Sequence, residues 1–171
     1  MRRGPCIVAA MLAGASLLIE AGLPRPRPLL IWNASGSVSI GLYQVQPIRQ
    51  WVVNEIVVVL PQGVLAGWLA GAGYLPKGVP MLKRILALPG QAVCRREHVI
   101  LIDGVEVGIA QESDRQGRPL PDWQGCRIVG AAELFLMNRQ SDSSLDGRYF
   151  GLTATSEVIG RAIPVWTRDP S

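Results

Sequence analysis

Ser37 and Lys83 stand in two short segments whose composition suits the chemistry of peptide bonds. Residues 33–37 read Asn-Ala-Ser-Gly-Ser, and residues 83–90 read Lys-Arg-Ile-Leu-Ala-Leu-Pro-Gly. A serine hydroxyl attacks an amide efficiently only when a base lies nearby. His98 is the single histidine of the chain and lies in an alternating run that ends at a turn. A serine–lysine dyad is therefore the chemistry that this sequence supports most readily.

The segment around Ser37 combines a flexible backbone with two hydroxyl groups. Gly36, between Ser35 and Ser37, lets the backbone turn tightly and present a hydroxyl and an amide N–H to one point. We expect Ser37 to act as the nucleophile, while its own N–H and the Ser35 hydroxyl face the developing oxyanion. The same tripeptide by itself is also typical of an ordinary turn.

Lys83 lies inside an apolar run that reads as a strand. Strand alternation places Lys83 and Ile85 on one face and Leu82 and Arg84 on the other. A buried Lys83 would lose hydration, which lowers the pKa of its amine toward neutrality and frees it to accept a proton. In the other interpretation Lys83 points into solvent. Alternation alone leaves both interpretations open.

The elements that must position these residues are predicted to be short strands. Gly and Pro are frequent, and β-branched or alternating runs are separated by turn signals, which predicts a mainly β fold of short antiparallel strands. Asp103-Gly104 indicates a hairpin turn. The glycine-rich apolar residues 64–74 suggest a short helix that either packs in the core or dips into lipid, and residues 111–125 read as a surface loop. The predicted strands begin near Gly41 and continue at residues 52–60, 82–88, 99–107, 128–129, 133–137 and 158–166.

Size and charge narrow the class of protein. The 171 residues suffice for one globular domain with a core. The net charge of +4 comes from scattered arginines without aromatic residues between them, which argues against nucleic-acid binding and is ordinary for a protein beside an anionic membrane. The cysteine and histidine spacing supports no metal site, and we predict no cofactor.

The N-terminus reads as a targeting segment. Arg2 and Arg3 precede an apolar stretch at residues 6–19, and the Pro-Arg-rich residues 24–28 read as a stiff spacer. The stretch fits a retained membrane anchor, a cleaved signal peptide or a buried helix. We favour the anchor, with residues 1–28 as anchor and spacer and residues 29–171 as one extracytoplasmic domain on the periplasmic side of the membrane.

The predicted export of residues 29–171 bears on the redox state of the cysteines. Cys6 falls within the apolar stretch, whereas Cys94 and Cys126 fall in the exported part, where oxidising conditions favour a disulfide. The bridge would close a loop of about 33 residues and contribute around 3–4 kcal/mol. The alternative is a pair of buried free thiols.

Three motifs together resemble a known family. Ser-Gly-Ser followed by Gly-Leu-Tyr, Leu-Lys-Arg-Ile-Leu-Ala-Leu-Pro-Gly, and Ser-Leu-Asp-Gly-Arg-Tyr-Phe-Gly at residues 144–151 resemble type I signal peptidases. Their order and spacing are most similar to the conjugative-transfer TraF branch, which matures pilin subunits. The resemblance runs from about residue 32 to residue 166 and implies a signal-peptidase-like β-fold with an N-terminal hydrophobic helix.

The resemblance also implies roles for individual residues. Ser37 matches the nucleophile, Lys83 the general base and Ser35 the side-chain oxyanion donor, while Ser144 and Asp146 match residues that position the lysine and hold the site together. Asp146 could form a structural ion pair with Arg148, which we take as structural, or could be a plain turn residue. Two departures are Ser39, where the family usually has proline, and the lead into the last motif at residues 137–142.

The function implied by the resemblance is a membrane-associated serine endopeptidase. It would process exported pilin or leader sequences in conjugative transfer and release the acyl-enzyme to water or to an amine, with cyclisation when that amine is the substrate's own N-terminus. Its partners would be a pilin or preprotein, the membrane and other conjugation-apparatus proteins. The alternatives are a general leader peptidase, a non-catalytic pilin-assembly factor and a self-cleaving regulator. The residues do not decide between a linear and a cyclic product.

Overall fold

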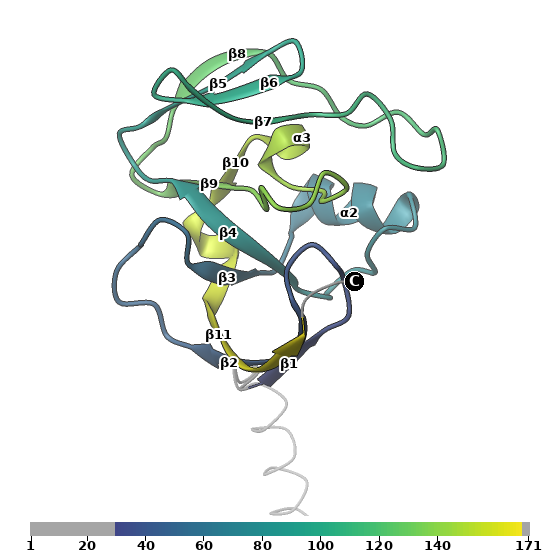
Figure 1. Ribbon diagram of the computed structural model, residues 1–171, viewed down its shortest axis with the longest axis vertical. Helices are drawn as coiled ribbons and strands as arrows, with labels where there is room; N and C mark the ends of the chain where they lie inside the picture. Colours follow the sequence, from purple (N-terminus) through teal and green to yellow (C-terminus); the bar gives the residue numbers. More distant parts are fainter. Residues whose placement is uncertain (1–29, 169–171) are drawn as a thin grey trace, which may run out of the picture.

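The computed structural model describes residues 30–168, which form two antiparallel β-sheets with short helices (Figure 1). The predicted mainly β fold class is therefore confirmed. The predicted anchor and spacer, residues 1–28, lie outside the described residues, and so does Cys6. Within residues 30–168, no helix combines the length and the apolar character that crossing a membrane requires.

The larger sheet has seven strands in the order β1-β2-β11-β3-β4-β9-β10. β4, which carries Lys83, lies between β3 and β9 and is paired antiparallel with both. The bounds of the strands in this order are Leu30–Asn33, Ile40–Gln46, Val158–Arg168, Ile56–Val59, Met81–Ala87, Glu133–Leu136 and Leu152–Ala154.

The long strand β11 bends this sheet. It pairs with β2 along one part and with β3 along another, and its register shifts in both pairings. Gly160 permits the close approach, because a Cβ atom there would lie 2.9 Å from the backbone oxygen of Gln46. Figure 1 shows the resulting curvature of the larger sheet, in which β1 and β2 lie below β3 and β4.

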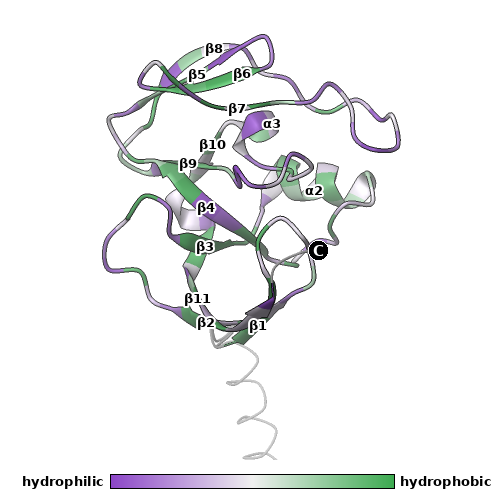
Figure 2. Cartoon of the chain, viewed as in Figure 1, coloured by the Kyte–Doolittle hydropathy of each residue, from purple (hydrophilic) through white to green (hydrophobic). Residues whose placement is uncertain are grey.

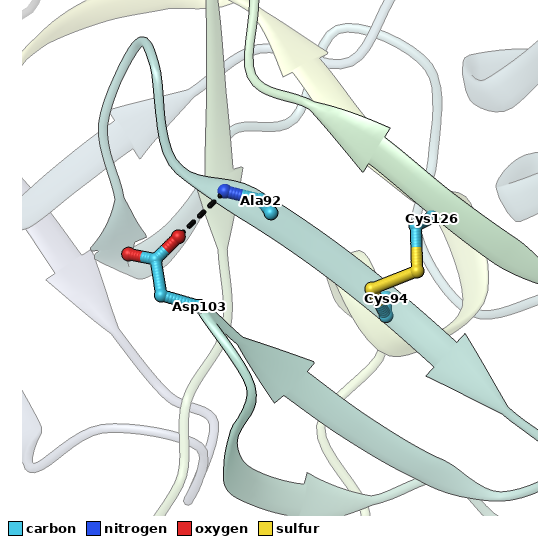
Figure 3. The surroundings of a disulfide bond; sticks show 4 residues. All are labelled: Ala92, Cys94, Asp103 and Cys126. Atoms are coloured by element: carbon cyan, nitrogen blue, oxygen red, sulfur yellow. Dashed lines mark hydrogen bonds between the residues drawn. A yellow bond between two sulfur atoms is a disulfide. The ribbon is translucent and has the colours of Figure 1, made fainter.

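The smaller sheet has four strands in the order β7-β6-β5-β8. Cys94 and Cys126 are partners across β5 and β8 and are joined by a disulfide, the pairing that the sequence favoured (Figure 3). At the other end of β5, the Asp103 carboxylate accepts a hydrogen bond of 2.8 Å from the Ala92 N–H. The bounds of the strands in this order are Val105–Ile109, Val99–Ile102, Ala92–Arg96 and Gly125–Ile128.

Three helical segments complete the described fold. α2 (Gly63–Gly71) confirms the short helix predicted from residues 64–74, and its Trp68 ring stacks on Tyr74 with centroids 5.2 Å apart. The 3-10 helix η1 spans Thr155–Glu157, and α3 spans Gly147–Phe150. Because Trp68 also meets the Phe150 ring edge-on, with centroids 5.6 Å apart, α2 packs against α3.

Three clusters of buried apolar residues fill the fold. One joins the two sheets, with Leu86 of β4, Val93 of β5 and Phe135 of β9 among its members. The second and third lie on the larger sheet and include residues of β2, β3, β4, β9 and β11. Figure 2 shows a hydrophilic stretch inside otherwise apolar β4, the place where Lys83 and Arg84 interrupt the apolar sequence.

Several predicted boundaries were wrong. The strand predicted at residues 52–60 is only Ile56–Val59, because residues before it form a turn in which Asn54 has a left-handed φ of 71°. The strand predicted at residues 128–129 lies at Gly125–Ile128, where pairing with β5 fixes it. Strands β1, β5 and β10 were not predicted. The hairpin turn at Asp103-Gly104 is confirmed by φ values of 50° and 83°.

Candidate active site

Residues 33–39, here called the serine loop, connect β1 to β2 and are organised by Asn33. Only 7 % of Asn33 is exposed. Its amide oxygen accepts hydrogen bonds from the N–H and the hydroxyl of Ser35, at 3.2 and 2.9 Å. Its amide nitrogen donates to the carbonyl oxygens of Ser35, Val38 and Ser39, at 2.8 to 3.2 Å. One buried side chain thus fixes the shape of the loop that carries Ser37.

The two serine hydroxyls contact each other. Ser35 Oγ and Ser37 Oγ are 3.1 Å apart. Because the Ser35 hydroxyl has one proton and the Asn33 oxygen is only an acceptor, Ser35 donates to Asn33 and accepts from Ser37. The hydroxyl proton of Ser37 therefore points toward Ser35 in this arrangement. Ser37 itself is half-buried, and Ser35 is exposed.

Lys83 is buried in the middle of β4, so the inward-facing interpretation is correct. The residue is 5 % exposed, and its amine donates a hydrogen bond of 2.8 Å to the Ser144 hydroxyl. Burial lowers the pKa of Lys83 to about 8; the negative charge of Asp146 opposes this shift, and the positive charge of Arg148 adds to it. An amine in this environment releases its proton far more easily than one in water.

The loop that holds Ser144 is fixed by a buried ion pair. The Asp146 carboxylate accepts from the Arg148 guanidinium at 2.9 and 3.0 Å, and both side chains are almost fully buried. Arg148 also donates to the carbonyl oxygens of Ser141 and Ser144, at 2.6 and 3.2 Å. Asp146 therefore forms the ion pair with Arg148 that the sequence suggested and is not a plain turn residue, and its carboxylate also caps α3.

Asn138 ties this loop to β4 on both sides of Lys83. Its amide nitrogen donates to the Leu82 carbonyl oxygen at 3.1 Å, and its amide oxygen accepts from the Arg84 N–H at 2.9 Å. Its own N–H donates to Asp146 at 3.0 Å. We call β4 together with residues 138–148 the lysine region. Because Asn138 is fully buried, its hydrogen bonds fix the position of Lys83 relative to the loop that carries Ser144.

Two further features stabilise the lysine region: close packing at Gly147 and a hydrogen bond from Arg95. A Cβ atom on Gly147 would lie 2.7 Å from the Leu136 carbonyl oxygen, so the turn after Asp146 requires glycine. Arg95 of β5 is 3 % exposed and donates to the Arg148 carbonyl oxygen at 2.8 Å. The smaller sheet therefore supports the loop that positions Ser144.

The serine loop and the lysine region meet through a shared apolar cluster. Val38, which follows Ser37, and Leu82, which precedes Lys83, are buried in the same cluster. Within residues 30–168, the hydrogen bond of the Lys83 amine goes to Ser144, and no hydrogen bond joins it to Ser37. The structure therefore pairs Ser35 with Ser37 and Lys83 with Ser144.

Some residues that organise the site were not found from the sequence. Asn33 and Asn138 were present in quoted segments but had no assigned role, and Arg95 lies in a strand that was not predicted. An asparagine two residues before a Ser-Gly-Ser turn is a recognisable signal for a side chain that caps backbone groups. His98 is outside the site, since its ring is half-exposed and lies 3.4 Å from Glu112. Among the described residues, no group of acidic, cysteine or histidine side chains could hold a metal ion.

The fold and this site define the class of protein. A family model described as signal peptidase, peptidase S26, matches residues 3–167, and the chain belongs to this family. The plasmid transfer protein TraF of Escherichia coli is 32 % identical over 93 % of this chain and 90 % of its own length. The conjugal transfer protein TraF of Agrobacterium fabrum is 35 % identical over 81 % of this chain and 82 % of its own length. The resemblance drawn from the three motifs is therefore confirmed.

A solved structure is also similar. The crystal structure of a signal peptidase I from Enterococcus faecalis matches 67 % of this chain and 97 % of its own chain, with a TM-score of 0.40 and 18 % identity.

Proposed function

We propose that this protein is a membrane-associated serine endopeptidase that processes exported pilin or leader sequences in conjugative transfer through a Ser37–Lys83 dyad. The single observation that carries the proposal is the buried amine of Lys83, whose pKa is lowered to about 8 and whose position is fixed by Ser144. A structural lysine would be solvated or paired with a carboxylate. An amine that donates to a neutral hydroxyl is suited to accept a proton.

The reaction begins with a rotation of the Ser37 hydroxyl. In the resting arrangement its proton points to Ser35, so substrate binding must turn it toward Lys83. The neutral amine then takes the proton as Ser37 Oγ attacks the scissile carbonyl. The same proton passes from Lys83 to the nitrogen of the leaving amine, and the amide bond breaks to leave an acyl-enzyme. Ser144 keeps the amine in place during both transfers.

The oxyanion is stabilised by donors in the serine loop. The Ser37 N–H is one donor, and the Ser35 hydroxyl becomes the second when it turns away from the Asn33 oxygen. Asn33 keeps its bond to the Ser35 N–H and is therefore the positioning residue that holds Ser35 in place. The acyl-enzyme is released by water to give a linear product or, when the substrate's own N-terminal amine attacks, to give a cyclic product.

Membrane association is supported by an aromatic patch beside the first described strand. The Trp32 ring of β1 stacks on the Trp166 ring of β11 with centroids 5.9 Å apart, and both residues are more than half exposed. Leu30 and Val165, also more than half exposed, lie on the same two strands. Exposed tryptophans of this kind favour the membrane–water interface. In the sequence, Leu30 of this patch comes two residues after the segment that we interpret as the anchor and spacer.

The test is intact-mass spectrometry of a pilin precursor co-expressed with the full chain. Wild type is expected to convert the precursor, and Ser37→Ala and Lys83→Met are expected to leave it unprocessed. Lys77→Met is the matched control, because Lys77 is the other of the two lysines in the chain and is exposed. A cyclic product would be lighter by one water than the linear one.

The same experiment separates the alternatives. Processing that survives Ser37→Ala would overturn the proposal and favour a non-catalytic assembly factor. Ser37-dependent cleavage of unrelated secretory precursors at the same rate as pilin would favour a general leader peptidase. Folding of each variant is checked by circular dichroism, so that a missing product reports chemistry rather than unfolding.

A further inference from the structure

A preformed pocket is lined by Ser143 and Leu145, the two sequence neighbours of the residue that contacts the Lys83 amine. Its volume is about 640 Å³, within the ordinary range for ligand sites. The other walls come from Gly73 and Tyr74, which follow α2, from Tyr149 of α3 and from the loop between β7 and β8. The pocket therefore begins within one residue of the lysine's partner.

Another part of the pocket lining is held in place by contacts among three side chains, Tyr74, Asp114 and Arg118. The Tyr74 hydroxyl donates to Asp114 at 2.6 Å, and Arg118 forms an ion pair of 2.6 Å with the same carboxylate. Arg118 also donates to the Ala72 carbonyl oxygen at 2.6 Å, and its guanidinium lies 4.2 Å from the centre of the Tyr74 ring. These contacts attach the loop between β7 and β8 to the end of α2. Arg118 and Asp114 cancel each other's charge.

The remaining polar groups of the pocket are free to bind a ligand. Within residues 30–168, several lining side chains make no hydrogen bond or ion pair, and two of them, Arg115 and Asp142, carry opposite charges. Apolar contact is available from Leu120 and Leu145. Amide and hydroxyl groups of this kind pair with a peptide backbone and with polar side chains. The free polar side chains are Gln111, Ser113, Arg115, Gln116, Asp142 and Ser143.

The chemistry of the dyad decides which part of a substrate would lie here. The proton that Lys83 receives from Ser37 must reach the nitrogen of the leaving amine, so that nitrogen must approach the Lys83 amine. The carbonyl side stays with the oxyanion donors of the serine loop. The chain that continues from the leaving nitrogen therefore starts next to Lys83 and Ser144, and the two sequence neighbours of Ser144 line the pocket.

We infer that this pocket binds the leaving-group segment of the substrate polypeptide, and that this segment is hydrophilic and charged. The inference rests on the proposed function. Arg115 selects acidic side chains and Asp142 selects basic ones a few residues after the scissile bond. Specificity on this side is thereby separate from specificity on the acyl side.

The experiment measures cleavage of a synthetic peptide mixture, randomised on both sides of the scissile bond, by the full chain in detergent. Products are quantified by mass spectrometry. Arg115→Glu is expected to reverse the preference between acidic and basic residues after the bond, by roughly five-fold in kcat/KM for an exposed charge. Asp142→Lys is expected to change the preference in the opposite sense. Preferences before the bond are expected to stay as in wild type.

Matched controls separate this inference from the proposed function. Arg96→Glu makes the same charge change at an exposed position of β5 that does not line the pocket, and its profile is expected to equal that of wild type. The effect of Arg115→Glu is expected to vanish for peptides trimmed one residue after the scissile bond. Unchanged profiles in both pocket variants, or changes confined to the acyl side, would overturn the inference alone. Absence of Ser37-dependent cleavage in every peptide would overturn the proposed function and, with it, this inference.

Discussion

Ser37 is accessible from solvent and is held by neutral amide and hydroxyl groups, whereas Lys83 is buried and is held by a loop built on an ion pair. In the serine loop, Asn33 alone makes most of the organising hydrogen bonds. In the lysine region, Asn138, Asp146 and Arg148 share them, and all three are almost fully buried. The two halves of one candidate site are therefore stabilised by different kinds of interaction.

The difference follows from what each group must do in the function that we propose. A nucleophile has to be reached by a polypeptide, so its loop must stay at the surface. A lysine base has to lose its proton near neutral pH, so it must leave water. Removing charge from water costs stability, and the ion pair with its surrounding hydrogen bonds offsets part of that cost. Damage to the lysine region should therefore affect the whole fold, while damage to the serine loop should stay local.

The largest effect is expected from Asp146→Ala. The substitution leaves the buried Arg148 cation unpaired and frees the loop that carries Ser144. We expect the free energy of unfolding in urea to fall by about 3–5 kcal/mol. Asp142→Ala, an exposed position of the same loop, is the control and should change it by less than about 0.5 kcal/mol. Equal values for the two variants would contradict the structural importance of the ion pair.

A second prediction concerns pH and stability. The pKa of Lys83 is about 8 in the folded protein, compared with the ordinary value of 10.5 in the unfolded chain. Between these pH values the unfolded chain binds more protons, so the free energy of unfolding rises with pH. The expected rise is about 3 kcal/mol, and Lys83→Met should remove it. Parallel stability–pH curves for the two proteins would mean that Lys83 is hydrated in solution.

A smaller effect is expected from Ser144→Ala on the pH dependence of kcat/KM. Only the neutral amine accepts a proton, so activity rises as pH passes the pKa of Lys83. The Ser144 hydroxyl accepts from the amine and favours its charged form, so its removal should move the rise about one unit to lower pH. Ser156→Ala, at an exposed position of η1, is the control. A shift to higher pH would show that Ser144 does not act as the acceptor.

The smallest effect on stability is expected from Asn33→Ala. Several freed groups of the serine loop can turn to water, so unfolding should become easier by only about 1 kcal/mol. Activity should fall more than stability, because the Ser35 hydroxyl loses its fixed acceptor. Asn33→Asp keeps that acceptor and should retain more activity than alanine. A loss of stability as large as that of Asp146→Ala would contradict the expectation that damage to the serine loop stays local.

Local patterns in the sequence were sufficient for much of the fold. β4 and the Asp103-Gly104 hairpin were predicted within one or two residues, because an apolar run that ends at a Pro-Gly turn and a pair of left-handed turn residues are local signals. The strand predicted at residues 52–60 was too long, because Val52 and Val53 suit a strand by composition but are followed by the left-handed Asn54. The strand containing Arg95 was not predicted, because two adjacent arginines end its apolar pattern and a buried arginine is rare.

The sequence by itself determined the order of the motifs, the strand that carries Lys83 and the family to which they point. Tertiary structure decided that Lys83 faces inward, because alternation defines two faces and only the packing of residues 138–148 against β4 buries this one. The contact of the amine with the Ser144 hydroxyl, which the resemblance implied, also forms only in the tertiary structure, since Ser144 lies 61 residues further along the chain. Contacts across such separations depend on how sheets and loops pack together, and a local pattern contains no information about that packing.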